Sequence, residues 1–318
     1  MLTFPALRRC FALCATALPL VAAAFPDRPI EWVVPYPAGG GSDVVARLLA
    51  EQMGKSLGQT IIVNNKPGAA TNIGADYAAK AKADGHVMLT ADTATLAANP
   101  ALYTKLTYSA EKDFASVGLM ARFPMILVVG AGVPVKNLAE FIAWAKQQAG
   151  GVSYATPGAG SPHHLATELF RERSGIRLVH VPYRGAAPAV QDVVGGQVPF
   201  MFVDTASGYA HILSGKLRPI GVASPKRLAS FDSIPTLAEQ GMKGFEAYAW
   251  QGLVVPASTP AATVALLNKA LLSALDTTAV KARFQTLGLE AIPSTAPQMA
   301  AYAKAEREKW GQIGRAHV

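Results

Sequence analysis

The chain has 318 residues, and its 29 lysines and arginines exceed its 21 aspartates and glutamates, which gives a formal net charge of +8. The basic residues are scattered and form no run that alternates with aromatic residues, so the composition argues against nucleic acid binding. Both cysteines, Cys10 and Cys14, lie near the N-terminus, so the rest of the chain holds no disulfide and must be stabilised by its core.

The N-terminus carries the features of a secretory signal peptide, which we place at residues 1–24. Arg8 and Arg9 precede an apolar run that ends in Ala22-Ala23-Ala24, a small-residue cleavage site before Phe25. The run is too short to cross a bilayer. We therefore expect an exported protein, and both the general secretory and the twin-arginine routes stay open.

The first loop after this segment is the most informative part of the chain. A strand at Ile30–Val34 leads into a turn with three glycines and then into a helix that we expect to start at Ser42 or Asp43. Such a start aims unpaired backbone N–H groups at the positive end of a helix dipole. The loop lacks the Lys-Ser/Thr pair of a P-loop and the spacing of a dinucleotide fingerprint. We interpret it as an anion site that holds a carboxylate.

Strand-like and helix-like segments alternate along the chain, which predicts an α/β fold with mainly parallel sheets. The expected strands are Ile30–Val34, Thr60–Val63, Val87–Ala91, Ser116–Ala121, Met125–Val129, Val152–Ala155, Arg177–Val181, Pro199–Val203, Arg218–Ala223 and Leu253–Val255. The expected helices are Ser42–Leu57, Ile73–Ala83, Leu138–Gln148, Pro162–Ser174, Ala187–Val194, Thr205–Leu213, Thr236–Gln240, Ala261–Asp276 and Pro297–Gly311.

No low-complexity linker divides the chain, although about 290 residues after the signal suggest two domains. Two strand-like passages, Phe123–Val129 and Tyr248–Val255, are suited to cross between domains. We therefore predict one discontinuous lobe, residues 25–124 and 250–312, and one inserted lobe, residues 125–249. A ligand cleft would lie between the two lobes.

Three further strand-to-helix loops repeat the design of the first. One apolar strand opens into Asp92 and Thr93, one is followed by glycines and by Ser161 at a helix start, and one ends on Asp204. Arg184 lies in the turn before another helix. It faces an anion or is an ordinary solvated arginine, and the residues around it fit both interpretations.

The adjacent histidines His163 and His164 do not predict a metal site, because neighbouring helical residues point about 100° apart and no second ligand cluster accompanies them. We interpret His164 and Glu168, at i and i+4, as an ordinary pair on a helix surface. Hydrolysis is disfavoured as well, since neither Ser42 nor Ser161 lies in a G-x-S-x-G nucleophile elbow. We therefore expect no enzyme activity, no metal and no cofactor.

The last residues, 313–318, have the sequence that a common sequencing adapter encodes. We expect this segment to be an artefact, with the authentic sequence ending near Gln312. The alternative is an ordinary polar C-terminus.

Short segments along nearly the whole chain carry a resemblance to one known family. They are Val33–Asp43, Val63–Ala70, Tyr154–Ser161, His164–Leu165, Glu168–Phe170, Val181–Gly185, Gly195–Val198, Gly215–Arg218 and Pro235–Thr236. With these segments the chain resembles the substrate-binding proteins of tripartite tricarboxylate transporters, the Bug family of periplasmic solute receptors. The resemblance runs from Pro29 to about Trp310. It implies a two-lobe periplasmic-binding-protein fold of type II, the Venus flytrap, whose loops grip a small carboxylate.

The resemblance implies that the first loop forms one side of the cleft and that loops of the inserted lobe form the other side. The residues that we expect to bind the ligand are Tyr36, Pro37, Ala38, Gly39, Gly40, Ser42, Asp43, Asp92, Thr93, Thr156, Gly158, Gly160, Ser161, His164, Arg184, Gly185 and Asp204. The carboxylates of Asp92 and Asp204 allow an amino or amide group on the ligand. Among these loops we expect bulk at Gly40 to weaken binding.

By the same resemblance, we expect a monomeric periplasmic receptor for a small organic acid or related solute. It would deliver this solute to the large and small membrane subunits of a tripartite tricarboxylate-type transporter. The alternative is a ligand-binding sensor component that feeds a signalling partner. The family is broad in its ligands, so the solute itself stays open.

Overall fold

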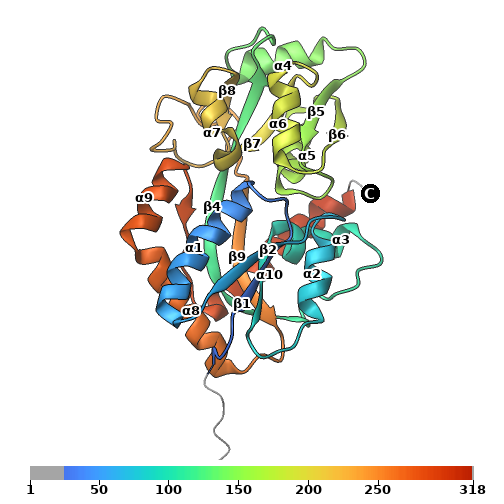
Figure 1. Ribbon diagram of the computed structural model, residues 1–318. Coiled ribbons are helices and arrows are strands. Elements are labelled where there is room, and N and C mark those ends of the chain that lie inside the picture. The colour runs from blue at the N-terminus through green and yellow to red at the C-terminus, as the bar shows by residue number, and fades with distance from the viewer. Residues whose placement is uncertain (1–24, 317–318) are drawn as a thin grey trace, which may run out of the picture.

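The computed structural model describes residues 25–316. The predicted signal peptide, residues 1–24, and the last two residues of the predicted artefact, 317 and 318, lie outside the described residues. The described chain forms two lobes stacked end to end, and Figure 1 shows them joined by long strands through the middle of the molecule.

Within the described residues, ten strands form one connected ladder. They are β1 (Ile30–Val34), β2 (Ile61–Asn65), β3 (Val87–Asp92), β4 (Phe114–Gly130), β5 (Val152–Thr156), β6 (Leu178–Pro182), β7 (Phe200–Asp204), β8 (Leu217–Val222), β9 (Tyr248–Pro256) and β10 (Glu290–Ala291). Their order is β2-β1-β3-β9-β4-β7-β5-β6, and β8 and β10 also pair with β4. The β1–β3 and β5–β7 groups are parallel, whereas β4, β8, β9 and β10 pair antiparallel, so the ladder is mixed rather than mainly parallel.

Helices cover both faces of this ladder. They are α1 (Gly41–Leu57), α2 (Asn72–Ala79), α3 (Asn99–Leu102), α4 (Leu138–Lys146), α5 (Pro162–Ser174), α6 (Ala186–Val194), α7 (Thr205–Leu213), α8 (Ala261–Asp276), α9 (Thr278–Thr286) and α10 (Ala296–Ala316), with a π-helical turn η1 (Thr93–Ala98). Helices α4–α7 surround the lobe at the top of Figure 1, and the other helices surround the lobe below it. Among residues 25–316, no helix combines the length and the apolar character needed to cross a membrane.

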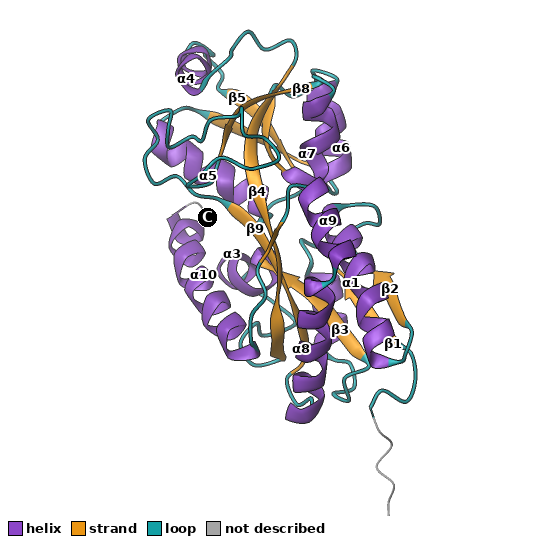
Figure 2. Ribbon diagram, turned by 90° about the vertical axis from the view of Figure 1, so that its left-hand side faces the viewer, coloured by secondary structure: helices purple, strands orange, loops and turns teal. Residues whose placement is uncertain are grey.

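Strand β4 links the two lobes. Its first half pairs antiparallel with β9, from Phe114 opposite Pro256 to Pro124 opposite Tyr248. Its second half pairs with β7 and β8 of the other lobe. Figure 2 shows β4 and β9 side by side along the middle of the molecule. The two passages that we expected to cross between lobes are thus partners in one ribbon, and the lobe boundaries predicted near 124 and 250 fall on it and stay a prediction.

Strand β4 also corrects the expectation of two separate strands before and after residues 122–124. Proline lacks the N–H that a central strand needs, so Pro124 suggested a break. In the structure Pro124 lies where β4 passes from its pairing with β9 to its pairing with β7, which starts at Met125. The strand therefore continues through the proline.

The lobe that contains β1 is packed on both faces of its sheet. Trp32 of β1 is fully buried in one core cluster with Leu49 of α1 and Leu271 of α8, whereas its neighbour Val33 belongs to a second cluster with Met299 of α10. Successive residues of a strand point to opposite faces, so a strand covered on both sides must be apolar throughout. The sequence of β1 meets this requirement except at the partly buried Glu31.

Three local predictions were wrong. Thr236–Gln240 is a single turn rather than a helix: the Thr236 and Glu239 side chains bond each other's backbone N–H groups at 3.0 and 2.7 Å, as at a helix start, but Gly241 follows at φ +104° and ends the turn. Helix α9 was not predicted, although Thr277 caps it by accepting from the Val280 N–H at 3.3 Å. The segment after Asp92, expected as a loop, is η1 followed by α3.

The aromatic core of the α4–α7 lobe allows a test of its packing. Phe141 is fully buried, with its ring centroid 4.9 Å from Phe200 and 5.9 Å from Phe170. We expect Phe141→Ala to lower the free energy of unfolding by about 3–5 kcal/mol, measured by urea denaturation. The control Ile62→Ala removes a side chain that is 54% exposed, and it should change stability by less than about 0.5 kcal/mol. Equal effects of the two changes would contradict this description of the core.

Candidate functional site

A cavity of about 320 Å³ lies between the two lobes. Its lining includes eleven of the residues predicted to bind the ligand: Tyr36, Pro37, Ala38, Gly39, Gly40, Ser42, Asp92, Ser161, Arg184, Gly185 and Asp204. Asp92 ends β3, and the others come from the starts of α1, α5, α6 and α7 and from the segments just before them. The structure therefore gathers these residues around one space, and their contact with a ligand stays a prediction.

Two of the four helix starts have no side-chain cap. Helix α1 begins after Gly40 and α6 begins after Gly185, and neither glycine offers a side-chain acceptor to the first turn. The first N–H groups of a helix lack intrahelical partners and carry its partial positive charge. These two termini can donate hydrogen bonds to an anion in the cavity. Helix α1 starts at Gly41, slightly earlier than predicted.

The other two helix starts are capped by their own side chains. Ser161 accepts from the His164 N–H of α5 at 3.3 Å, and Asp204 accepts from the Ser207 N–H of α7 at 2.9 Å. Such capping bonds satisfy part of the first turn. Ser161 and Asp204 therefore hold their own helices as well as lining the cavity.

Asp204 is also paired with His163, which was not among the predicted ligand-binding residues. The Asp204 carboxylate lies 3.0 Å from Nε2 of His163, and both side chains are more than nine-tenths buried. Burial works to raise the pKa of Asp204, but the hydrogen bond and charge of His163 and the Ser207 N–H outweigh it and lower that pKa. We therefore take Asp204 as ionised. The two residues meet because β5 and β7 are neighbours and the loops after parallel strands meet at one edge, an adjacency that the sequence alone did not reveal.

Asp92 lies in the cavity wall without a cationic partner among the described residues. It accepts from the Thr95 N–H at 2.9 Å and from the Tyr36 hydroxyl. Burial raises the pKa of Asp92, against the opposing effect of these hydrogen bonds. Burial and the Asp92 charge raise the pKa of Tyr36, so Tyr36 keeps its proton and donates. This wall of the cavity therefore presents acceptor oxygens.

Two predicted residues of the β1–β3 lobe lie behind the lining. Asp43 is 3% exposed and accepts from the Gly39 N–H and from Asn65, both at 2.9 Å, while pairing with Arg47. It therefore shapes the first loop from inside the protein. Thr93 is fully buried, and its hydroxyl lies 3.5 Å from the Trp250 N–H.

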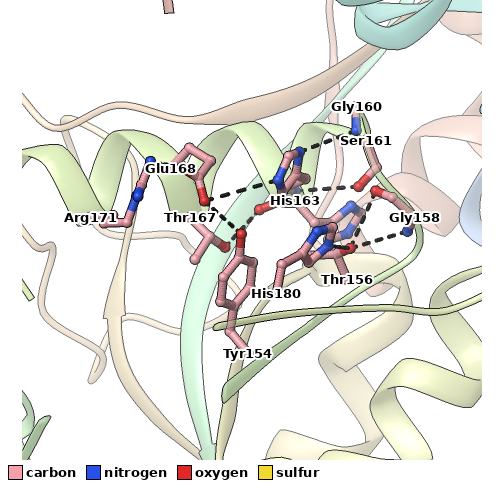
Figure 3. Close-up of polar contacts among 11 residues, drawn as sticks. Tyr154, Thr156, Gly158, Gly160, Ser161, His163, Thr167, Glu168, Arg171 and His180 are labelled. Atoms are coloured by element: carbon pink, nitrogen blue, oxygen red, sulfur yellow. Dashed lines mark hydrogen bonds and ion pairs between the residues drawn. The ribbon is translucent and has the colours of Figure 1, made fainter. Parts of the chain in front are cut away.

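Four predicted residues of the other lobe, Thr156, Gly158, Gly160 and His164, also lie outside the lining. They belong to the end of β5, the loop after it and α5, and Figure 3 shows the polar contacts in this region. His164 does not form an ordinary surface pair with Glu168, because Glu168 is only 8% exposed and is held at 2.6 Å by both Tyr154 and Arg171. These residues brace the loop rather than form the cavity wall.

The ribbon of β4 and β9 supplies lining residues that were not selected. They are Phe123, Ala249, Trp250 and Gln251. Gln251 lies opposite Asp92 in the sheet and donates to the Ser42 hydroxyl. The prediction that Phe123–Val129 and Tyr248–Val255 cross between the lobes could have pointed to them, because a strand that crosses there turns one face to the cleft.

Gly41 is the tight glycine of the first loop. A side chain there would begin 3.1 Å from the ring of Phe123 and 3.2 Å from Ala206 of α7, in the opposite lobe. At Gly40 the nearest atom to an added Cβ would be the Pro37 carbonyl oxygen at 3.6 Å, an ordinary contact. We therefore expect bulk at Gly41 to weaken binding more than bulk at Gly40.

Charged side chains are few around the cavity. Arg184 is exposed and forms no ion pair among the described residues, and it is the one lysine or arginine in the lining. The lining also contains two acidic residues, Asp92 and Asp204, whose charge is opposite to that of Arg184. Within residues 25–316 no group of three or more His, Cys, Asp or Glu side chains could hold a metal ion. An anion here would depend mainly on N–H and hydroxyl donors.

Comparison with known proteins identifies the family. The profile of the tripartite tricarboxylate transporter family receptor matches residues 45–317, and the chain belongs to this family. Protein BugT of Bordetella pertussis is 35% identical over 305 residues, 96% of this chain and 94% of that protein.

Two solved structures support the same assignment. The periplasmic binding protein BugD has a TM-score of 0.86 and 34% identity over 92% of this chain and 98% of that one. MatC of Rhodopseudomonas palustris, solved with bound malate, has a TM-score of 0.86 and 32% identity over 91% of this chain and 100% of that one. The predicted family and the two-lobe periplasmic-binding-protein fold are confirmed. The family and these relatives are binding proteins, which confirms the prediction that the chain is not an enzyme.

The loop after β5 generates a test of pH dependence. Burial, with the charge of His164, lowers the pKa of His180 from 6.5 to about 4. The folded state therefore keeps His180 neutral while the unfolded chain takes up a proton. The contribution of neutral His180 to the free energy of unfolding is fully present above about pH 6.5. About 1–3 kcal/mol of it is lost as the pH falls towards 4.

Urea denaturation at a series of pH values will measure this loss. In His180→Phe the ring can stay stacked but cannot titrate, so the variant should lose less stability in acid by about that amount. Parallel stability curves for the wild type and the variant would contradict the expectation.

Proposed function

We propose that this chain, as a member of that receptor family, captures a small carboxylate in the periplasm and delivers it to the large and small membrane subunits of a tripartite transporter. The observation that carries this proposal is the cavity between the lobes, where the uncapped starts of α1 and α6 meet the guanidinium of Arg184. Donors of this kind suit an anion. The malate bound to MatC is a small carboxylate and supports the same class of ligand.

The strength of such binding must come from many donors. Micromolar affinity needs about 8 kcal/mol net. A helix terminus contributes about 0.3–1 kcal/mol, and up to about 2 when partly buried. Hydrogen bonds to a charged group contribute about 1.5–3 kcal/mol each. Several contacts from both lobes are therefore required, which favours a ligand that is enclosed between them.

The acceptor oxygens in the cavity restrict the ligand further. Asp92 and Asp204 both line the space, and Asp92 has only neutral partners. A purely anionic surface on the ligand would be repelled on this side. We infer that the ligand carries a hydroxyl, amino or amide donor in addition to its carboxylate.

Enclosure requires the lobes to move about the β4–β9 ribbon, with boundaries near residues 124 and 250. The lobes touch beside the cavity, where Pro37 lies against Gly185 and Gly41 lies against Ala206. We infer that these contacts belong to a state in which the cleft is closed. Ligand binding would shift the population toward this compact state.

A panel of small carboxylates tests the ligand class directly. Malate, succinate, adipate and glutamate, with propylamine as a cationic control, are compared by thermal shift and then by calorimetry. At least one carboxylate should bind with micromolar affinity, and mass spectrometry of material released from the purified protein should contain a carboxylate. Saturable binding of the amine alone would overturn the proposal.

Gly41→Val tests closure. The added side chain meets Phe123 and Ala206, so it should hold the lobes apart and weaken carboxylate binding by at least about tenfold. Small-angle scattering with saturating ligand should show a larger radius of gyration than for the wild type. The matched change Gly40→Ala adds a Cβ with ordinary contacts and should have a much smaller effect. Equal affinities and radii for Gly41→Val and the wild type would contradict closure at this contact.

Ser161→Ala tests the hydroxyl in the cavity wall. Its loss should cost about 1–3 kcal/mol of binding free energy, and about 0.5–2 kcal/mol of stability because Ser161 also caps α5. The control Ser174→Ala removes the hydroxyl that bonds the Phe170 carbonyl at the other end of the same helix. Calorimetry and denaturation on both variants separate the two effects. If Ser174→Ala lost as much affinity as Ser161→Ala, the loss would come from a weakened helix α5 and not from the missing hydroxyl in the cavity wall.

A further inference from the structure

The loop from Thr156 to Ser161 contributes two residues to the cavity lining and is also tied to a second wall. Pro157 and Ser161 line the cavity. The Pro157 carbonyl accepts from the Gly185 N–H at 3.0 Å, and Gly185 precedes the uncapped start of α6. A shift of this loop would therefore move two of the surfaces that face a ligand.

Two stacked imidazoles support the loop from behind. The rings of His164 and His180 lie 4.2 Å apart at an interplanar angle of 16°, and the ring of Tyr154 is nearly parallel to both, 4.9 Å from His180 and 6.3 Å from His164. Each imidazole bonds the loop. Nδ1 of His164 accepts from the Gly160 N–H at 3.2 Å, and Nε2 of His180 lies 2.6 Å from the Thr156 hydroxyl (Figure 3).

The two contacts respond differently to a proton. The Gly160 N–H can only donate, so Nδ1 of His164 must be an unprotonated acceptor. A proton on Nδ1 would set two donors against each other and break this contact. The Thr156 hydroxyl can donate its own proton to the Gly158 carbonyl at 3.2 Å, and it also lies 3.2 Å from the Gly158 N–H. Its oxygen can therefore accept from Nε2 of His180 whether that ring is neutral or charged.

We propose that His164 and His180 are positioning residues that hold the Thr156–Ser161 loop in its ligand-binding form, and that proton uptake by the pair releases the loop and weakens binding. The binding half of this inference rests on the proposed function, whereas the positioning half does not. Two cationic rings cannot stack at this separation without strong repulsion, so the intact stack requires that at least one ring is neutral.

The groups around the two imidazoles determine how well a positive charge on either ring is stabilised. On α5, Glu168 lies 4.0 Å from Nε2 of His164 and is held by Arg171 at 2.6 Å. On β5, the Tyr154 hydroxyl donates to Glu168 at 2.6 Å. Glu168 is thus already engaged by a cation and a hydroxyl, which reduces its ability to stabilise an imidazolium beside it. Burial and the charge of His164 also lower the pKa of His180 to about 4, so the charged pair is disfavoured.

The substitutions separate the loop contact from the charge. In His164→Asn the amide oxygen takes the place of Nδ1 as an acceptor for the Gly160 N–H but cannot titrate in this range. His164→Leu removes the acceptor and keeps an apolar side chain. His180→Gln can keep a bond to the Thr156 hydroxyl without a titrating ring.

Amide hydrogen exchange of the ligand-free protein tests the positioning half. After correction for intrinsic exchange, protection of the amides of residues 158–161 should fall about 5- to 20-fold in the wild type between about pH 7.5 and pH 5. His164→Asn should lose much less, and His164→Leu should already be unprotected at pH 7.5. Circular dichroism at both pH values checks that the fold is intact. Unchanged corrected protection in the wild type, or protection of the wild-type size in His164→Leu, would overturn the inference.

Calorimetry with malate as the probe tests the binding half. The dissociation constant of the wild type should rise about tenfold over the same pH range, and His164→Asn should flatten the profile, whereas His180→Gln replaces a ring that already stays neutral in this range and should leave the profile sloped. A profile that is as steep in His164→Asn as in the wild type would overturn the inference. If neither malate nor another carboxylate of the panel binds at pH 7.5, the proposed function fails, while hydrogen exchange still decides the positioning role.

Discussion

The unpaired N–H groups at the starts of helices are the constraint on which this structure depends. Every helix leaves several such donors, and each needs an acceptor from a side chain, water or ligand. Four helices begin at the cavity between the lobes. Ser161 and Asp204 satisfy part of α5 and α7, whereas the glycines before α1 and α6 offer no side-chain acceptor. The fold thus concentrates donors at one place and leaves some of them for another molecule.

The balance of charge follows from this arrangement. Backbone donors carry partial positive charge without a formal cation, so the cavity can contain two carboxylates and one arginine and still suit an anion. Asp204 is stabilised as an anion by His163, and Asp92 is buried among neutral donors. These acids orient the loops, and they also set which neutral groups a bound solute can carry.

Local signals predicted much of the site because its loops have recognisable chemistry. The glycine turn before α1, the Ser161-Pro162 helix start and the acid that ends β7 each follow from capping and dipole rules that act within a few residues. Asp43 shows the limit of this reasoning. Its position in the first turn suggested the cavity, but its oxygens bond Gly39 and Asn65 inside the loop.

The residues that were missed depend on neighbours far along the chain. His163 meets Asp204 only because β5 and β7 are adjacent, and Phe123 and Trp250 reach the cavity only because β4 and β9 pair. Pairing order is a property of the whole sheet, and periodicity within one segment does not contain it. The brace formed by His164 and His180 has the same origin, since β6 brings His180 beside α5.

The position of Phe123 and Trp250 has a mechanical consequence. Both line the cavity, and both lie on the ribbon that connects the lobes, one strand apart. If the lobes close about this ribbon as proposed, a solute in the cavity acts close to the pivot, where the lever arm is short. Rigid lobes amplify a small displacement at a pivot in proportion to distance, and α4 lies at the far end of its lobe in Figure 1. The length and width of the bound solute would then be reported at the outer tips, so a partner that touches only those tips could distinguish one cargo from another.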